Sequence, residues 1–376
     1  MGTQTTVFHA DVVGSLLRPP ELAAAREAHR AGRIPAEGLS KVEDRAIDEA
    51  LRMQEEIGFD VVTDGEFRRD LFFDIFFRGL TGLSTGTPWT AVFRNRKTNT
   101  AMEVTIPFTA VEKVRSNGSC AAVDEFLYVA ERTDRVVKVT LPGPTTAPIV
   151  MWHQEHSRDA YPDWYGLAED TAEVIRGWIG QLADAGCKYI QIDAPDIAQA
   201  FADPQVRDDY AARGIEPDRF MDLGMDLYGS LPGAAPSGTM VSLHVCKGNG
   251  TQSWIAEGGY DDFAAAVVRK ASGYDGYHFE YDDERSGTFE ALKSVPDDKA
   301  VSLGLVSTKW TTIEEPDALR ARVDDAARFH PKEMLSISTQ CGFASGGETA
   351  DQRMITDETQ RRKLEVIVET ARSIWG

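Results

Sequence analysis

Eight short apolar runs, each ending in polar, Gly or Pro residues, recur along the 376-residue chain and constrain its fold more than any other feature. Charged and apolar residues lie at helical spacing between them. The eight runs are 7–15, 59–66, 136–144, 189–195, 240–246, 276–280, 300–308 and 335–341. Eight strands that alternate with helices predict an α/β fold, a single (β/α)8 TIM barrel. An open doubly wound sheet is the alternative, and its site would lie at the same strand ends.

A long segment interrupts this alternation after the second strand. Residues about 80–135 are rich in Thr, Gly and residues that favour strands. Structureless loops of that length are uncommon inside compact domains, so the β-rich segment predicts an inserted β-hairpin or lid over the barrel mouth. Residues 1–376 are therefore expected to form one catalytic barrel with this insertion.

The charge of the chain excludes one class of partner. Acidic side chains number 60 and basic ones 40, for a formal net charge of −20, whereas nucleic-acid binders carry basic surfaces. No window approaches the roughly 18 apolar residues of a membrane span, and the first residues lack the layout of a signal peptide. Four scattered cysteines are too few for a disulfide framework. We expect a cytoplasmic protein that binds neither nucleic acid nor membrane.

Potential metal ligands gather at the predicted strand ends. His244 and Cys246 are two residues apart in a strand, so both side chains face the same side. Cys341 and Glu280 end two other strands, and together the four residues form a possible tetrahedral zinc set. Burial of these residues as ordinary core is the alternative. His278 shares the face of Glu280, where it could transfer protons or simply pack.

A zinc site with cysteine ligands and an exchangeable carboxylate suits one kind of chemistry. Zinc lowers the pKa of a bound thiol, so a thiolate forms at neutral pH and attacks an electrophilic carbon. Glu66 and Asp193 also lie at strand ends and are candidates to bind a substrate; as alternatives they cap helices or lie in loops.

The motifs together resemble the catalytic barrel of cobalamin-independent methionine synthase and its short single-barrel relatives. The matching pieces are Val13-Gly14-Ser15, Thr63-Asp64-Gly65-Glu66, Leu141-Pro142-Gly143-Pro144, Ile190-Gln191-Ile192-Asp193, His244-Val245-Cys246, Phe279-Glu280 and Gln340-Cys341-Gly342. The resemblance implies zinc bound by His244, Cys246, Glu280 and Cys341. It also implies that Gly14 and Ser15 hold the carboxylate of homocysteine, while Glu66 and Asp193 hold its ammonium.

Three departures limit what the resemblance implies. The full-length enzyme resembles two barrels in tandem, and this chain has room for one. Ala194 replaces a glutamate, and Val306-Ser307-Thr308-Lys309 replaces a His-Ser-Pro element. Recognition of the methyl donor and protonation of its leaving group are therefore open, with Asp193 or His278 as candidate acids and Trp152 as a candidate to stack on a pterin.

The sequence thus predicts a zinc-dependent S-methyltransferase that makes methionine from homocysteine, with a 5-methyltetrahydrofolate-type or other donor. Epoxyalkane:coenzyme M transferase is the alternative, because these short relatives share the HxC element and a distant cysteine. Its sulfonate substrate would need cations, for which Arg18, Arg68, Arg69, Lys247 and Lys309 are candidates. A metal-free decarboxylase of the uroporphyrinogen decarboxylase type is a remote alternative. The thiol, the alkyl donor and the oligomeric state stay open.

Overall fold

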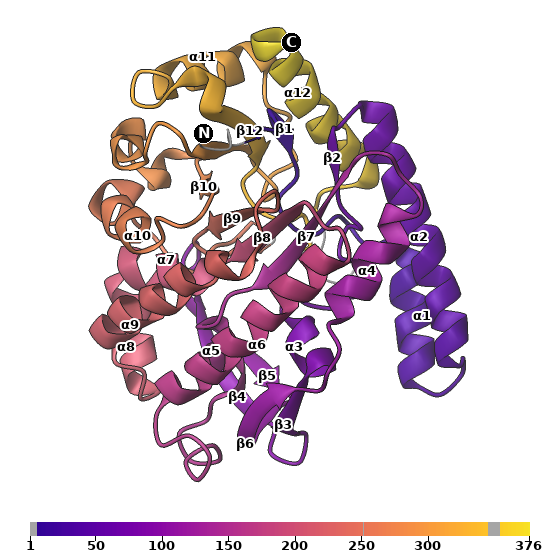
Figure 1. Cartoon of the computed structure of the whole chain (residues 1–376), viewed down its shortest axis with the longest axis vertical. Helices are drawn as coiled ribbons and strands as arrows, with labels where there is room; N and C mark the ends of the chain where they lie inside the picture. Colours follow the sequence, from indigo (N-terminus) through magenta and orange to yellow (C-terminus); the bar gives the residue numbers. More distant parts are fainter. Residues whose placement is uncertain (1–5, 251, 345–353) are drawn as a thin grey trace.

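Eight parallel strands form a nearly closed barrel (Figure 1). The computed structural model describes residues 6–250, 252–344 and 354–376. Hydrogen-bonded neighbours follow the order β1, β12, β11, β10, β9, β8, β7, β2. The strands are β1 (Ala10–Asp11), β2 (Val61–Val62), β7 (Val136–Pro142), β8 (Tyr189–Asp193), β9 (Met240–Val245), β10 (Gly276–Glu280), β11 (Ala300–Val306) and β12 (Leu335–Thr339). β1 and β2 end this series and contact each other, so the single (β/α)8 barrel is confirmed.

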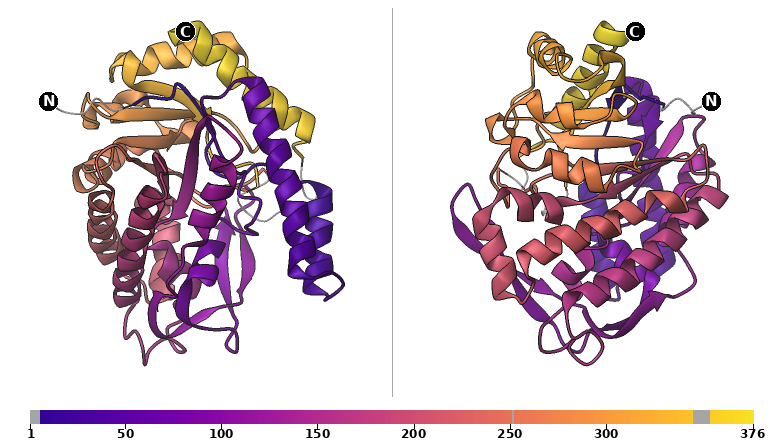
Figure 2. Two further views of the ribbon diagram at one scale, coloured as in Figure 1. Left: turned by 45° about the vertical axis from the view of Figure 1, so that its right-hand side comes forward. Right: turned by 60° about the vertical axis from the view of Figure 1, so that its left-hand side comes forward.

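Helices surround the barrel and bury its outer face (Figure 2). They are α1 (Pro20–Arg30), α2 (Ala36–Ile57), α4 (Ala121–Ala130), α5 (Thr146–Met151), α6 (Trp164–Asp184), α7 (Pro195–Ala202), α8 (Pro204–Ala212), α9 (Pro217–Ser230), α10 (Ala264–Lys270), α11 (Pro316–Ala326) and α12 (Asp357–Trp375). α12 packs against α2, which brings the last helix beside the first ones. No described helix is long and apolar enough to cross a membrane.

Alternation along the strands separates the core from the barrel interior. In β10, Tyr277 and Phe279 stack on each other within the hydrophobic core, with ring centroids 5.9 Å apart. His278 and Glu280, on the other face of the strand, are buried among polar partners. Side chains alternate along a strand, so one face of β10 packs in the hydrophobic core and the other carries polar groups into the barrel. In such barrels the site lies at the carboxyl ends of the strands.

The segment after β2 forms the predicted β-rich insertion. It begins with α3 (Asp74–Gly79) and contains two antiparallel pairs rather than one hairpin. β3 (Leu80–Ser84) pairs with β6 (Thr109–Ser116), and between them β4 (Trp89–Asn95) pairs with β5 (Thr100–Ile106). We call the β4–β5 unit the lid hairpin.

Candidate active site

Three predicted metal ligands meet at the carboxyl ends of β9 and β12. His244 lies in β9, Cys246 follows that strand directly, and Cys341 follows β12. Their ligand atoms all lie within 4.8 Å of one another, and the two sulfur atoms are 3.9 Å apart. All three side chains are buried. We call these residues the metal cluster.

The metal cluster fits a zinc ion. Two thiolates that each bind tetrahedral zinc at about 2.3 Å lie about 3.8 Å from each other, close to the observed separation. His244 Nδ1 lies 2.8 Å from Asp193 Oδ1, so Nε2, which lies 3.4 Å from the Gln340 carbonyl oxygen, is the nitrogen that could bind a metal. A carboxylate on the far nitrogen is the usual partner of a zinc-bound histidine. Three protein ligands with one position left for substrate are typical of catalytic zinc sites.

Charge and burial act on the protonation of the metal cluster. The hydrogen bond to Cys341 and burial raise the pKa of Cys246 well above its usual value. Burial disfavours the charged form of His244, but the hydrogen bond and the charge of Asp193 outweigh it, so the pKa of His244 is raised. A thiol in this place becomes a thiolate only when a cation compensates it.

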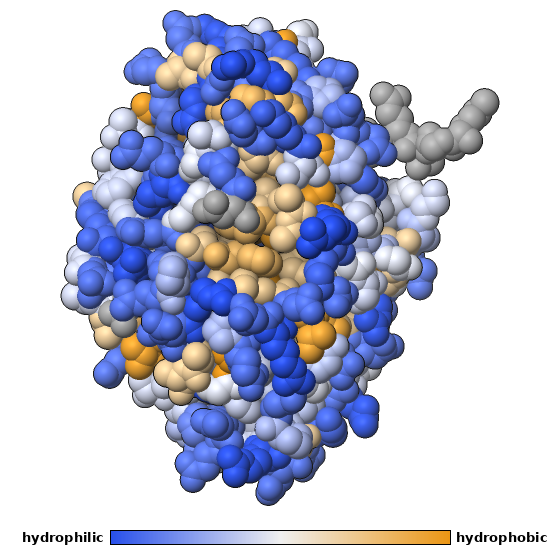
Figure 3. Space-filling model, turned by 90° about the vertical axis from the view of Figure 1, so that its left-hand side faces the viewer, coloured by the Kyte–Doolittle hydropathy of each residue, from blue (hydrophilic) through white to orange (hydrophobic). Residues whose placement is uncertain are grey.

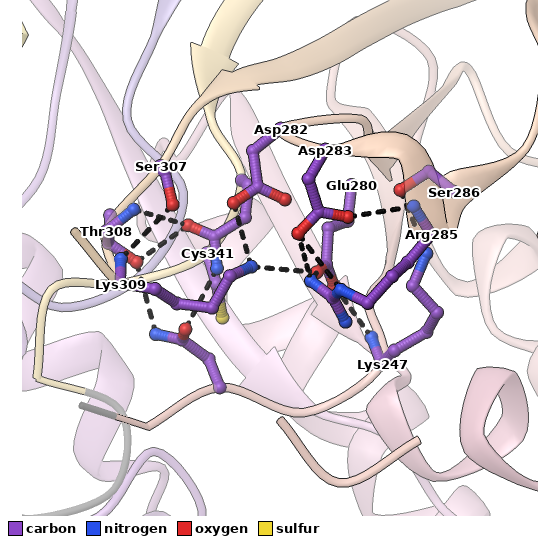
Figure 4. Close-up of polar contacts among 12 residues, drawn as sticks. Lys247, Glu280, Asp282, Asp283, Arg285, Ser286, Ser307, Thr308, Lys309 and Cys341 are labelled. Carbon is purple, nitrogen blue, oxygen red and sulfur yellow. Dashed lines mark hydrogen bonds and ion pairs between the residues drawn. The ribbon is translucent and has the colours of Figure 1, made fainter. Parts of the chain in front are cut away.

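Glu280 is held outside the metal cluster by cations (Figure 4). Its Oε1 lies 3.0 Å from Lys309 Nζ and 3.3 Å from Arg285 Nη2, and its Oε2 accepts from the backbone N–H of Lys247 at 3.0 Å. Lys309 also lies 2.8 Å from Asp282. Burial alone would raise the pKa of Glu280, but Lys309, Lys247 and Arg285 lower it far below its usual range. Glu280 could join a metal only if these ion pairs rearranged.

The predicted substrate groups surround the metal cluster. Asp193 Oδ1 accepts hydrogen bonds from His244 and from Gln191 Nε2, the latter at 2.8 Å. Glu66 Oε1 accepts from Thr140 Oγ1 at 2.8 Å, and burial raises the pKa of Glu66. Both carboxylates line the same cavity as the metal cluster.

Gly14 and Ser15 form another edge of that cavity. Gly14 has φ +73°, and a Cβ there would lie 3.3 Å from Gly342 Cα, so glycine suits both its backbone conformation and this close approach. Ser15 accepts from the backbone N–H of Phe343 at 2.7 Å and, through Oγ, from that of Ala344 at 3.2 Å. These contacts join the loop after β1 to the loop that carries Cys341.

The cavity has a volume of about 610 Å³ and mostly apolar walls. The lid hairpin contributes Phe93, Val104 and Ile106 to these walls. The other large apolar side chains are Leu71, Phe72, Phe73, Ile149, Val150, Trp254 and Ile255. The molecule is also hollowed on the face of Figure 3, where apolar side chains gather at the centre and hydrophilic ones surround them.

Comparisons with known proteins place the chain in a family. The family model described as the catalytic domain of cobalamin-independent synthase matches residues 8–361. The chain belongs to the cobalamin-independent methionine synthase family. It is 33% identical over 374 residues to the uncharacterized protein YxjH of Bacillus subtilis, covering 98% of this chain and 95% of YxjH. It is 24% identical over 338 residues to a methionine synthase of Pyrococcus furiosus, covering 90% and 86% of the two chains.

A solved structure agrees with this family membership. A protein of Listeria monocytogenes, assigned as a vitamin-B12-independent methionine synthase, is 25% identical, with a TM-score of 0.74 over the whole of both chains. The resemblance to the cobalamin-independent methionine synthase family is thus confirmed, and the family points to a methyltransferase.

Two residues predicted to serve this family's chemistry lie away from the cavity. His278 Nε2 lies 3.0 Å from Tyr189 Oη and 3.0 Å from Ser242 Oγ, inside the barrel. Burial and the charges of Lys138 and His244 lower the pKa of His278 well below its usual value. Trp152 is buried and donates its indole N–H to the Tyr161 carbonyl at 3.2 Å. It lines a separate cavity. His278 packs edge-on against His244, with ring centroids 6.4 Å apart, but it does not line the cavity of the metal cluster.

Sequence reasoning missed Asp196 and the role of Lys309. Asp196 lines the cavity and accepts hydrogen bonds from three hydroxyl groups, those of Thr145, Thr146 and Tyr228. Its position in α7, just beyond the end of β8, was the available signal. For Lys309 the signal was its place in the segment that replaces the His-Ser-Pro element of the cobalamin-independent methionine synthases.

Proposed function

We propose that this chain is a zinc-dependent S-methyltransferase that methylates homocysteine and forms methionine. One observation carries the proposal: His244, Cys246 and Cys341 line the same cavity as Glu66 and Asp193. A soft metal site and a pair of carboxylates together match a substrate that has both a thiol and an ammonium group.

Each group has a role in this proposal. A zinc ion bound by His244, Cys246 and Cys341 would lower the pKa of a substrate thiol, so that the thiolate forms at neutral pH. Asp193 orients His244, and with Glu66 it holds the ammonium of homocysteine. Backbone N–H groups at Gly14 and Ser15 hold the carboxylate. The thiolate then attacks the methyl carbon in line with the bond that breaks.

Glu280 and the general acid have separate roles in this proposal. Glu280 is close enough to the metal cluster for its charge to raise the pKa of Cys246, and we propose it as a ligand that exchanges with the substrate sulfur. Asp193 is the predicted acid that lines the cavity, whereas His278 does not line it. Asp193 is therefore our candidate to protonate a leaving group that needs a proton.

Coenzyme M fits the cavity less well than homocysteine. Its sulfonate needs a cation, and none of the described residues that line the cavity is Lys or Arg. Lys309 pairs with Glu280 and Asp282, and Lys247 donates to Ser286 Oγ at 3.0 Å. We therefore do not propose the coenzyme M reaction.

The experiment that tests the function combines metal analysis with thiol competition. Purified protein should contain one zinc ion per chain, and homocysteine should displace a chromophoric thiol from it at concentrations where coenzyme M does not. A His244→Ala variant should lose both properties, while a Cys187→Ala variant, altered at a cysteine outside the metal cluster, should keep them. Protein without zinc, or with equal affinity for both thiols, would contradict the proposal.

A further inference from the structure

We infer that Asp196 is a specificity-determining residue that binds the methyl donor. Its carboxylate accepts from two adjacent N–H groups of a flat heterocycle, which in a methylfolate-type donor are those of the 2-amino-4-oxo ring of the pterin. The inference rests on the proposed function, and it adds a contact for the second substrate.

Asp196 lies just beyond the carboxyl end of β8. It is the second residue of α7, three residues after Asp193. It is only 3% exposed, and it lines the cavity that contains the metal cluster. Ala194 replaces a glutamate of the family pattern, so Asp196 supplies this strand end with a second carboxylate two positions later.

Asp196 has no role in binding homocysteine in the proposed function. Three carboxylates are among the described lining residues of the cavity, those of Glu66, Asp193 and Asp196. Glu66 and Asp193 form the proposed ammonium site, and the charge of Asp193 helps to raise the pKa of Glu66, as expected of neighbouring carboxylates. An ammonium group has three N–H donors, which these two carboxylates can accept. Asp196 is therefore available to a second substrate.

Three hydroxyl groups hold the Asp196 carboxylate. Oδ1 accepts from Thr146 Oγ1 at 2.8 Å and from Tyr228 Oη at 3.3 Å, and Oδ2 accepts from Thr145 Oγ1. Burial raises the pKa of Asp196 more than these hydrogen bonds lower it. A carboxylate has about four acceptor positions, and the Tyr228 contact is longer than a usual O–H···O hydrogen bond. One position on each oxygen can therefore take an N–H group of a ligand.

A glycine allows this arrangement to form. A Cβ at Gly143 would overlap the Tyr228 hydroxyl, so glycine at this position lets the hydroxyl reach Asp196. Tyr274 Oη donates to the Tyr228 carbonyl at 3.0 Å, which fixes this part of α9. The carboxylate is thus held in place before a ligand arrives, and such preorganisation lowers the entropic cost of binding.

Apolar side chains contribute to the same cavity wall. Ile149 and Val150 lie in α5 with Thr146, which donates to Asp196, and Phe93 comes from the lid hairpin. A flat ring can pack against such side chains while its polar edge meets the carboxylate. N–H groups that donate to a carboxylate form strong, charge-assisted hydrogen bonds. The wall therefore suits a heterocycle that is recognised by its edge.

Two pteridines that differ at one position test the contact. 6,7-Dimethylpterin presents an N–H beside an amino group, whereas 6,7-dimethyllumazine has a carbonyl in place of that amino group. On zinc-loaded protein with homocysteine bound, the pterin should bind about tenfold more tightly in a calorimetric titration, because the carboxylate accepts from N–H groups and repels a carbonyl oxygen. Equal affinity of the two probes, or no binding of the pterin, would overturn the inference.

Asp196→Asn changes the hydrogen-bonding pattern at the same size. An amide accepts at its oxygen and donates at its nitrogen, which matches the N–H and the carbonyl of the lumazine. The preference for the pterin should therefore disappear or reverse, while zinc content and homocysteine affinity stay unchanged. An unchanged preference in this variant would contradict the inference.

Tyr228→Phe is the matched control, because it removes one partner of Asp196 and keeps the carboxylate. Both variants should lower the midpoint of chemical denaturation, but Tyr228→Phe should keep the preference for the pterin. Loss of that preference to the same extent in both variants would assign Asp196 a structural role and overturn the inference.

The two proposals fail in different ways. If homocysteine adds a sulfur to the zinc but the pterin is not preferred, the assignment of Asp196 fails and the thiol methyltransferase stands. If homocysteine adds no sulfur to the zinc, the proposed function itself fails.

Discussion

The floor and the roof of the cavity are built in different ways. The floor is the metal cluster and Asp193, placed by barrel strands in register: Asp193 of β8 lies opposite His244 of β9. The roof is the lid hairpin, whose strands pair only with each other and whose side chains toward the cavity are apolar. We therefore expect the barrel to determine the proposed thiol chemistry, while the insertion supplies apolar walls to the space that a second substrate would enter.

The largest effect is expected from removal of a ligand from the metal cluster in the floor. Cys341→Ser removes one of two thiolates from the metal cluster, so zinc should be lost on dialysis and methionine formation should fall below detection. Zinc content by atomic absorption and product by mass spectrometry would measure this. Retention of zinc and of full activity would show that the cluster is not the metal site.

Lys309→Ala tests whether Glu280 is restrained by its ion pairs. Both side chains are fully buried, and removing one partner of a buried pair costs about 3–5 kcal/mol of the free energy of unfolding. Chemical denaturation would measure that loss. A matched change on the exposed Lys293–Glu290 pair, Lys293→Ala, should change it by about 1 kcal/mol or less. A similar small loss for Lys309→Ala would refute the restraint.

Asp193→Asn weakens the floor without removing a ligand. The amide cannot accept from His244 with the strength of a carboxylate, so zinc affinity or activity should fall about 10–100-fold. Competition with a chelator measures the affinity. The Michaelis constant for homocysteine should rise as well, and an unchanged value would remove Asp193 from the ammonium site.

Arg96→Gln loosens only the roof. Loss of the ion pair with the buried carboxylate of Asp203 should raise the Michaelis constant of the methyl donor by about tenfold, which corresponds to about 1.4 kcal/mol. Zinc content and homocysteine affinity should not change. Arg361→Gln, which alters the exposed pair between Arg361 of α12 and Glu56 of α2, is the control. An effect on zinc binding would show that floor and roof are coupled.

The same contrast explains what the sequence could predict. The spacing of His244 and Cys246 within one strand follows from local alternation, and parallel pairing brings Cys341 to the same barrel end. The pairing of Glu280 with Lys309 depends on side-chain geometry between neighbouring strands, which spacing alone does not reveal. The distance of Trp152 from the cavity depends on how the chain turns after α5. Phe93 and Val104 reach the cavity only because the hairpin folds back over the barrel.

The most direct test of the central claim is X-ray absorption at the zinc edge, with and without homocysteine. We predict a first coordination sphere of two sulfurs, from Cys246 and Cys341, with the nitrogen of His244 and other nitrogen or oxygen ligands. A third sulfur should join it when homocysteine is added. A spectrum that does not change, on protein shown to bind homocysteine, would contradict the activation of the thiol at this metal.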